Sequence, residues 1–383
     1  MPLKINGSSS GYTEIKAADA AANNTLTLPS ASGTIVAADS SGAAGVTTLN
    51  ASGNITSGGT VIMASSFLRN RIINGDMRID QRNAGASVSV ASSLSYTLDR
   101  WIAAEITDGA MTIQRVADGP NGFSNSMKLT TTTADGSLAA DQRASVQQAI
   151  EGFNISDLAF GTSGAQTVTA SFWVKSSLTG SFGGSVCNSG GTRAYPFSYT
   201  INSADTWEYK TVAISGETTG TWASDNTTGM LLRFGLGVGS TYSGTAGAWS
   251  TSNIVAPTGS VSVIGTLNAT WQITGVQLEV GSTATPFERR QYGQELALCQ
   301  RYYETGDGEL GCYATNGGGI GARASFKQTK RATPTMTLTN VYMANTTQNG
   351  SYDVNVNGFF PIATATATGM AQFWYSFTAS AEL

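Results

Sequence analysis

The chemistry open to this chain is limited first by a missing residue type, because none of its 383 residues is a histidine. That absence removes Ser-His and Cys-His nucleophile pairs, imidazole acid–base catalysis and most zinc chemistry. Sugar hydrolysis by two carboxyl groups about 5–10 Å apart would survive it. Asp205 with Glu208, and Asp307 with Glu309, are acidic pairs close in sequence. Only 25 acidic residues are spread along the chain, so we interpret both pairs as turn residues beside strands and expect neither an enzyme nor a catalytic residue.

Aromatic side chains in loops offer a second chemistry, because an exposed ring can stack on the C–H face of a sugar while amides and carboxylates bind its hydroxyls. The Gly/Ser/Thr-rich segments 219–226 and 240–250 carry such rings, which we expect to be more exposed than the strand residues Trp173 and Trp271. Residues 305–383 carry further candidates. The predicted glycan-binding residues are Trp222, Tyr242, Trp249, Tyr313, Tyr342, Tyr352 and Phe359. The alternative for a loop tryptophan is a lid over the core of its own domain.

The composition excludes several partners. Charged residues make up 12% of the chain and the net charge is −4, whereas binding to nucleic acid needs a surplus of Lys and Arg. No run of about 18 apolar residues is present, so we expect no membrane insertion. The first residues lack the apolar core of a signal peptide, and we expect the chain to fold in the cytoplasm in which it is made. The three cysteines, Cys187, Cys299 and Cys312, have unrelated spacings and are predicted to be buried thiols.

Residues 1–66 contain almost no large side chains, and single apolar residues stand between clusters of Gly, Ser, Asn and Thr. Short alternating patterns at 25–29 and 33–39 predict strands. A lone chain of this composition cannot enclose a core, but copies wrapped around a shared axis can. We therefore expect a trimeric stalk, the alternative being a disordered linker.

Period-two alternation predicts strands from residue 67 to residue 287. In 167–175, Val168, Ala170, Phe172 and Val174 share one face. Similar patterns occur in 230–238 and 270–281, and Gly275 interrupts the second of these as a bulge would. About a dozen such strands, separated by turn residues, predict a two-sheet sandwich of the jelly-roll type.

One helix is predicted, over 288–304, where Tyr292, Leu296, Cys299 and Tyr303 have helical spacing. Gly306 and Gly308 are expected to end it. Strand patterns then resume to the C-terminus, where Phe373, Tyr375 and Phe377 share one face and Trp374 the other. The sequence thus predicts an all-β chain in four parts. They are a thin N-terminal trimeric β stalk (1–66), a central jelly-roll sandwich (67–287), a short helical neck (288–304) and a small C-terminal β-sandwich tip (305–383).

Several segments resemble one family of proteins. These are GYTEIKAADAAANNTLTLPSASGTIVAAD near the start, NRIINGDMRIDQRN, QLEVGSTATPFERRQYGQELALCQRYYE, KRATPTMTL and the ending FTASAEL. Together they cover about a third of the chain and are similar to segments of the tail fibres of tailed bacteriophages. The resemblance implies a homotrimeric virion protein that attaches to tail or baseplate proteins by its N-terminus and contacts a host surface glycan with its distal β-domains. The chain is shorter than long fibres and lacks an obvious C-terminal chaperone segment.

The middle region also resembles carbohydrate-binding modules of the jelly-roll type, which open with a turn like Asn74-Gly75-Asp76 and close with a strand like Gln277-Leu278-Glu279. This resemblance implies a structural calcium ion at Asn74, Asp76 and Glu279, since calcium takes oxygen ligands. The alternative is an Asx turn at Asn74. No other cofactor is expected.

Arginines cluster at both ends of the predicted sandwich: Arg69, Arg71, Arg78, Arg82, Arg289 and Arg290, with Glu288 beside them. They are interpreted either as inter-subunit ion pairs, for which the planar guanidinium is well suited, or as a solvated strand edge. Two other functions stay open. One is a secreted bacterial protein, either an enzyme or an adhesin, built on a carbohydrate-binding module. The other is a baseplate adaptor that never touches the host.

Overall fold

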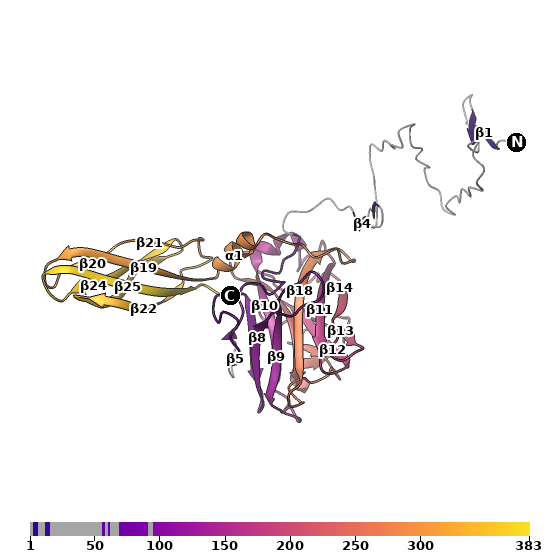
Figure 1. Cartoon of the computed structure of the whole chain (residues 1–383). Coiled ribbons are helices and arrows are strands. Elements are labelled where there is room, and N and C mark those ends of the chain that lie inside the picture. The colour runs from indigo at the N-terminus through magenta and orange to yellow at the C-terminus, as the bar shows by residue number, and fades with distance from the viewer. Residues whose placement is uncertain (1–2, 7–11, 16–55, 58–59, 62–68, 91–94) are drawn as a thin grey trace. The chain divides into compact units, whose positions relative to one another are not determined.

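The computed structural model describes residues 3–6, 12–15, 56–57, 60–61, 69–90 and 95–383 (Figure 1). Contacts divide the chain into two units, Met1–Ala64 and Ser65–Leu383. In the first unit, two pairs of short antiparallel strands are described: β1 (Leu3–Asn6) with β2 (Tyr12–Ile15), and β3 (Thr56–Ser57) with β4 (Thr60–Val61).

The remainder of the predicted stalk lies outside the described residues, including the strands expected at 25–29 and 33–39. The trimeric stalk and the boundaries of the four predicted parts therefore stay predictions. The all-β class itself is confirmed.

The centre of the second unit is a sandwich of two six-stranded sheets, in which all neighbouring strands are antiparallel. Sheet I has the order β13 (Ala194–Ile201), β12 (Gly180–Cys187), β15 (Thr228–Val238), β10 (Arg143–Glu151), β7 (Trp101–Ile106) and β6 (Ser95–Tyr96). Sheet II has the order β14 (Glu208–Ile214), β11 (Val168–Ser176), β18 (Thr270–Val280), β9 (Ser126–Thr133), β8 (Ala110–Val116) and β5 (Val88–Ser89). The loops contribute the short parallel pair β16 (Ser243–Gly244) and β17 (Ala256–Pro257) and three 3₁₀ turns, Gly152–Asn154, Ser156–Leu158 and Ser240–Tyr242.

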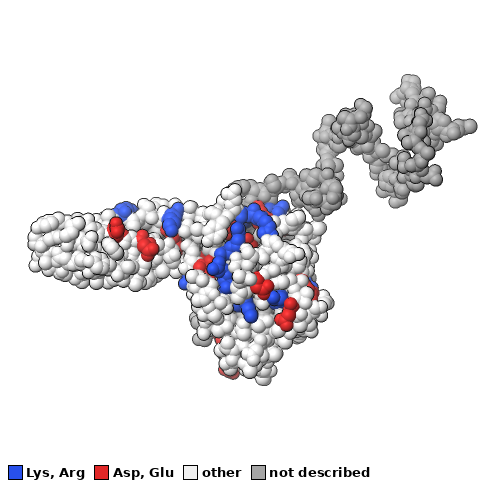
Figure 2. Space-filling model, viewed as in Figure 1, with Lys and Arg blue, Asp and Glu red and all other residues white. Residues whose placement is uncertain are grey.

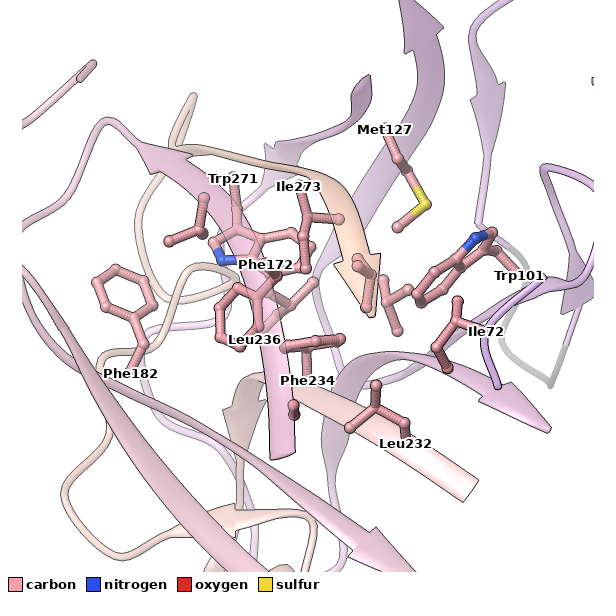
Figure 3. Close-up of a cluster of buried hydrophobic side chains, with 14 of the residues drawn as sticks. Ile72, Trp101, Met127, Phe172, Phe182, Leu232, Phe234, Leu236, Trp271 and Ile273 are labelled. Carbon is pink, nitrogen blue, oxygen red and sulfur yellow. The ribbon is translucent and has the colours of Figure 1, made fainter. Parts of the chain in front are cut away.

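The core lies between the two sheets, as the alternation predicts. On β11, Val168, Ala170, Phe172 and Val174 are all completely buried. Phe172 meets two aromatic residues of the opposite sheet, Tyr199 on β13 and Phe234 on β15, whose ring centroid is 5.0 Å away (Figure 3). Edge-to-face contacts of this kind stabilise the core beyond the burial of area alone.

Gly275 forms the predicted bulge in β18. The pairing with β11 shifts register between Ser171 and Trp173, and Gly275 has a φ of +61°. After the bulge, Val276 and Leu278 return to the buried face that Ile273 occupies before it. The bulge therefore keeps the apolar residues on both sides of it in the core.

The C-terminal region forms a second, smaller sandwich. One sheet has the order β19 (Tyr303–Ala314), β25 (Gly369–Ser380) and β22 (Thr335–Ala344). The other contains β20 (Gly319–Gly321), β24 (Gly358–Ala365), β21 (Ala324–Ser325) and β23 (Thr346–Asn355). Its core consists mainly of Phe326, Phe359, Phe373, Tyr375 and Phe377.

The helix is shorter than the sequence predicts. It spans only α1 (Tyr292–Gln300), and Gly306 and Gly308 lie within β19 instead of ending it. The prediction was wrong here because the backbone of 303–314 pairs along its whole length with β25, and this ladder replaces the helical hydrogen bonds. Within the described part of the chain, no helix is long and apolar enough to span a bilayer.

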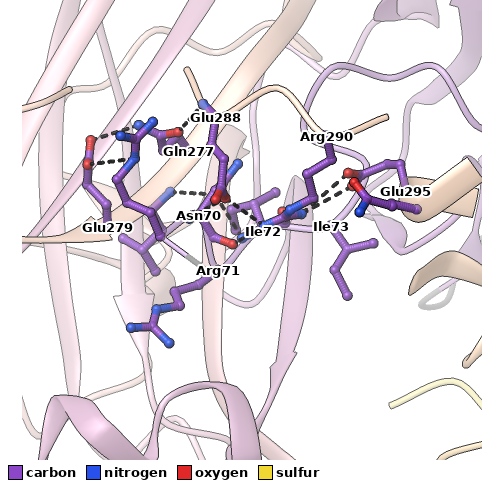
Figure 4. Close-up of polar contacts among 12 residues, drawn as sticks. Asn70, Arg71, Ile72, Ile73, Gln277, Glu279, Glu288, Arg290 and Glu295 are labelled. Carbon is purple, nitrogen blue, oxygen red and sulfur yellow. Dashed lines mark hydrogen bonds and ion pairs between the residues drawn. The ribbon is translucent and has the colours of Figure 1, made fainter. Parts of the chain in front are cut away.

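A polar seam joins the opening segment of the sandwich to β18 and α1 (Figure 4). The Asn70 side chain donates to the Val276 carbonyl at 3.1 Å and accepts the Leu278 N–H at 3.1 Å. Arg290 lies at the centre of the seam, donates to the carbonyl oxygens of Asn70 and Ile72, and pairs with Glu288 at 3.0 Å. We call these contacts the Asn70–Arg290 seam.

The arginines predicted to make inter-subunit ion pairs mostly have partners within the chain. Besides Arg290, they form the pairs Arg69–Glu279, Arg71–Asp157, Arg78–Asp76 and Arg82–Glu382. Folding brings a carboxylate of the same chain to each of these residues, so none of them needs a partner from another subunit, and pairing between subunits stays a prediction. Arg289 is the exception and has no ion pair in the part of the chain that the structure describes.

The cysteine prediction holds for two residues of three. Cys187 and Cys299 are buried free thiols, whereas Cys312 is exposed on β19. Cys312 lies near the end of β19, which is an edge strand of its sheet, and the end of an edge strand has few neighbours to cover a side chain.

The extreme C-terminus is bound to the central sandwich. The Tyr96 hydroxyl donates to the Leu383 carbonyl at 2.6 Å, and Glu382 pairs with Arg82 at 2.7 Å and with buried Arg100. Burial, together with the nearby Glu382 carboxylate, raises the pKa of Tyr96 from 10.0 to about 12.

Replacing the central cation of the seam should destabilise the sandwich. In Arg290→Gln, Glu288 and Glu295 lose their counter-ion in a mostly buried site, and we expect the free energy of unfolding to fall by about 3 kcal/mol. Arg323→Gln removes the exposed pair with Asp353 and should cost less than about 1 kcal/mol. Denaturant unfolding of the two variants measures the difference, and equal losses would contradict the role given to Arg290.

Docking of the C-terminus should be sensitive to alkali. Because the pKa of Tyr96 is higher in the folded than in the unfolded chain, its contribution to stability is complete below pH 10 and is lost as the pH rises to about 12. Thermal unfolding between pH 9 and about 12 should show a steeper loss in the wild type than in Tyr96→Phe. Parallel curves would show that Tyr96 titrates normally.

Candidate functional site

The outward face of sheet II carries an exposed aromatic pair. Because Phe172 and Val174 point into the core, Trp173 between them must point outward, and it is half-buried. Trp173 is paired in register with Tyr209 on β14. The two ring centroids are 5.3 Å apart at 46°, and Tyr209 is 43% exposed. The pair presents a ring surface to solvent.

Two adjoining hollows lie beside this pair. The larger, about 440 Å³, is lined by Phe123, Trp173, Tyr209, Gly275, Ala284, Thr285, Pro286, Phe287 and Arg289. The smaller, about 230 Å³, is lined by Asp76, Arg78, Gly122, Phe123, Ser124, Arg289 and Arg290. Phe123 and Arg289 border both hollows, and we call the two together the Arg289 groove.

Glycines at two positions make the groove possible. A Cβ on Gly275 would lie 2.7 Å from the Phe123 ring and 3.2 Å from Trp173. The bulge therefore leaves room for the Phe123 side chain above β18. A Cβ on Gly122, where φ is +89°, would lie 3.0 Å from an Arg289 nitrogen. Both positions combine a left-handed backbone with a close approach, which favours glycine.

The groove combines apolar rings with the Arg289 guanidinium, which makes no ion pair or hydrogen bond to the residues that the structure describes. The Arg289 guanidinium lies 4.5 Å from the Phe123 ring centroid and 5.8 Å from that of Phe287. At the other end, Asp76 pairs with Arg78 through Oδ2 at 2.5 Å, whereas its Oδ1 is buried without a partner among the described residues. Figure 2 shows a band of Lys and Arg side chains across the visible face of the sandwich. The groove thus offers rings for stacking and N–H donors.

The acidic pairs predicted from the sequence lie elsewhere. Asp205 belongs to a turn before β14, as predicted, whereas Glu208 is the first residue of β14 and accepts the N–H groups of Asn202 and Ser203. Burial raises the pKa of Glu208, but hydrogen bonds from Lys210 and from the turn outweigh it and lower the pKa to about 2. Asp307 and Glu309 do not belong to a turn. They lie inside β19 and are exposed.

The loop tryptophans are lids. Trp222 and Trp249 pack edge-on against Phe160, with ring centroids 4.9 and 6.0 Å away. Each indole N–H donates to a backbone carbonyl, that of Thr219 at 3.1 Å for Trp222 and that of Ser215 at 2.9 Å for Trp249. Both are partly buried against the core, which favours the lid interpretation over a binding role.

Tyr242 is half-buried and lies near Arg143, whose guanidinium is 4.4 Å from the centre of its ring. That guanidinium occupies one face of the ring. Tyr242 therefore packs against Arg143 and is not among the residues that line the Arg289 groove.

The C-terminal candidates have different surroundings. Tyr313, 75% exposed, and Tyr342, 45% exposed, lie on the sheet formed by β19, β25 and β22. Tyr342 contacts Trp374 of β25 at a ring distance of 4.9 Å. Tyr352 lies in β23, but its side chain lies outside the described residues. The prediction of Phe359 was wrong, since alternation along β24 places it completely in the core beside Phe377.

The predicted calcium ligands do not fit a calcium ion. Asn74 Oδ1 accepts the Ile79 N–H at 2.9 Å, five residues along the chain, whereas the Asx turn given as the alternative would bond the N–H two residues along. Asp76 pairs with Arg78, and Glu279 accepts the Thr285 hydroxyl at 2.5 Å. No group of three or more His, Cys, Asp and Glu side chains suited to a metal occurs among the described residues.

Comparison with known proteins gives structural neighbours only. No family model matches the sequence, and no curated protein matches it. The enzymatically active domain of tailspike protein 4 of bacteriophage CBA120 is 15% identical, with 55% of this chain and 21% of that chain covered and a TM-score of 0.30. The family 11 carbohydrate-binding module of Clostridium thermocellum is 12% identical, with 51% and 97% covered and a TM-score of 0.25.

A third neighbour is the N-terminal cellulose-binding domain of β-1,4-glucanase C of Cellulomonas fimi, 15% identical, with 48% and 90% covered and a TM-score of 0.22. This chain spans about a fifth of the tailspike chain that it matches. Identities and TM-scores this low do not transfer a ligand or an activity to this chain.

The sequence prediction missed the groove residues Phe123, Trp173, Tyr209 and Arg289, and it missed Trp374 as an exposed ring. The signal for Trp173 was available, because a residue between two inward-facing neighbours in a strand faces outward. Phe123 and Arg289 gave no such signal, since each lies in a connecting segment.

Thr274, on β18 beside the groove residue Trp173, provides a test of packing below the groove. It pairs with Trp173 in the ladder and is completely buried, and its hydroxyl has no partner among the described residues. Thr274→Val should therefore raise the free energy of unfolding by about 1 kcal/mol. Thr169→Val is the matched control on β11, where the hydroxyl donates to the Gly281 carbonyl at 2.7 Å, and it should lower the free energy by about 1 kcal/mol. Equal losses in urea titrations would show that the Thr274 hydroxyl has a partner.

Proposed function

We propose that this chain is a non-enzymatic tail-fibre protein of a tailed bacteriophage that recognises a glycan on the host surface. The observation that carries the proposal is the Arg289 groove, two adjoining open hollows in which an aromatic pair lies on one side of the Arg289 guanidinium and the Asp76–Arg78 pair on the other. Carbohydrate sites need this combination of a stacking surface and a few placed polar groups.

A sugar would enter the groove with the C–H face of one ring against Trp173 or Tyr209. Its neighbour along the glycan would reach Arg289, whose N–H groups can donate to hydroxyl or carboxyl oxygens. Asp76 would hold the Arg78 guanidinium in place at the other end of the groove. A sugar that enters the site displaces the water bound to these protein groups, and a sugar that left one of them unpaired would bind more weakly. Each of these contacts therefore contributes to selectivity as well as to affinity.

The assignment to a phage fibre is supported by the segments that resemble such fibres and by the composition of residues 1–66, which suits a stalk shared between copies. In this proposal the N-terminus binds tail or baseplate proteins and three chains form one fibre. Three weak sites per fibre, and several fibres per particle, would raise the effective affinity without new contacts. The mature protein would then be located in the virion.

Two rival functions make different predictions. A secreted bacterial carbohydrate-binding protein would bind glycan as a single chain. A baseplate adaptor would form an oligomer but bind no cell-surface sugar. Light scattering of the full-length protein and binding to glycans therefore separate the three. A folded, compact single copy would contradict the fibre.

Binding to an array of bacterial O-antigens and capsular polysaccharides tests the groove. Tyr209→Ala and Arg289→Gln should each weaken the strongest interaction about tenfold, the loss expected for about 1.4 kcal/mol. Phe153→Ala, which removes a 58% exposed ring outside the groove, is the control and should bind normally.

Variants of the C-terminal face form the second arm of this experiment. Should Tyr342→Ala and Trp374→Ala abolish binding while Tyr209→Ala has no effect, the receptor site would belong to the second sandwich. Should no glycan bind to the wild-type trimer, an adaptor would be favoured.

A further inference from the structure

Among the described residues, one buried cationic side chain has no carboxylate partner. Three cationic side chains are buried: Arg100, Lys330 and Arg233. Arg100 pairs with Glu382, and Lys330 pairs with Glu304 at 2.5 Å. Arg233, 5% exposed, has no ion pair in the described part of the chain. A buried charge without a counter-ion is costly, so this arrangement needs an explanation.

The partners of Arg233 are all neutral oxygens. Its guanidinium donates to the Ser185 hydroxyl at 3.0 Å, to the Asn253 side-chain oxygen at 2.7 Å and to the Ile254 carbonyl at 2.9 Å. These bonds use three of its five N–H groups. They hold the guanidinium plane in one orientation and leave donors for another acceptor.

Arg233 lies in a pocket on the outward face of sheet I. In the ladder, Gln147 of β10, Arg233 of β15 and Ser185 of β12 stand side by side. The pocket has a volume of about 130 Å³ and is lined by Arg143, Ser145, Gln147, Ser189, Gly190, Gly191, Leu231, Arg233, Asn253 and Val255. Apart from the two arginines its lining is uncharged.

Arg143 brings a second positive charge to the same pocket. It lies on the same face of β10 as Ser145 and Gln147, two and four positions along the strand. Its side chain stacks on Tyr242 at 4.4 Å and, within the described residues, makes no ion pair or side-chain hydrogen bond. Two guanidinium groups without an acidic neighbour in one pocket repel each other, and an anion would relieve that repulsion.

We propose that this pocket, here named the Arg143–Arg233 pocket, binds the carboxylate of an acidic sugar such as a hexuronic acid. The two guanidinium groups would bind the carboxylate, and Gln147 and Asn253 would bind adjacent hydroxyl groups. The small volume suits the charged end of one sugar residue. This is a second site, separate from the Arg289 groove, since it lies on the other sheet and faces away from it.

The turn that contains Gly191, beside the pocket, packs closely against the Asn253 side chain. Gly191 has a φ of +64°, and a Cβ there would lie 2.8 Å from the Asn253 side chain. Asn188 holds the turn by accepting the N–H groups of Thr192 and Arg193. The rim of the pocket is therefore positioned before any ligand binds.

Titration of the full-length protein with D-glucuronate tests the proposal, with D-glucose as the neutral control of the same size. We expect glucuronate to bind and glucose not to bind. Arg143→Gln should weaken glucuronate at least about tenfold, because a charge-assisted hydrogen bond contributes more than a neutral one. Lys128→Gln is the matched control, since it removes one positive charge from β9 on the other sheet.

Arg233→Gln should abolish glucuronate binding, and glucuronate should raise the Tm of the wild type but not that of Arg143→Gln. The Tm of Arg143→Gln keeps the test decisive if Arg233→Gln does not fold. Tyr209→Ala should leave glucuronate binding unchanged, so that failure of this pocket is distinct from failure of the Arg289 groove.

Three results would overturn the proposal. If glucose and glucuronate bound equally, or if neither bound, the pocket would not be a site for an anionic ligand. If inorganic phosphate bound as tightly as glucuronate, the pocket would bind anions in general and would not be a sugar site. A change in the mass of the Arg143→Gln particle in light scattering would assign the two arginines to a contact between copies.

Discussion

The sandwich depends on one constraint, that the polar outward face of β18 must be covered and paired. Gln277 and Glu279 on that face are nearly fully buried although they point away from the core. The Asn70–Arg290 seam covers them with the opening segment of the sandwich and with the segment that leads to α1. Because such groups are costly to bury without partners, their satisfaction ties both segments to sheet II. Arg289, which lies between the seam residues Glu288 and Arg290 in the chain, borders the groove instead.

The two outward faces of the sandwich carry different kinds of side chains. Sheet II exposes aromatic rings beside charged groups, whereas sheet I holds two arginines above a polar row. Neither arrangement contributes to the apolar core between the sheets. The residues on the outward faces can therefore differ without changing the fold, since alternation separates the side chains that pack from those that face solvent.

The C-terminal sandwich is bound to the central one through its ends. Arg301 contacts Glu151 of β10 at 2.6 Å where β19 begins, and Glu382 contacts Arg82 and Arg100 beyond β25. Both termini of this sandwich are thus held by ion pairs of which at least one member is buried. Its outward sheet carries Tyr342 and Trp374, whose rings give it a surface chemistry related to that of the groove.

The sequence by itself determined the all-β class, the inward faces of β11, β18 and β25 and the bulge at Gly275, because alternation is local and needs no knowledge of the partner strand. It did not determine the length of α1, the burial of Phe359 or the partners of the arginines. Those depend on which distant strand pairs with each segment and in which register. The groove is the clearest case: Phe123 and Arg289 belong to connections far apart in the chain, and only the order of strands in sheet II brings them together.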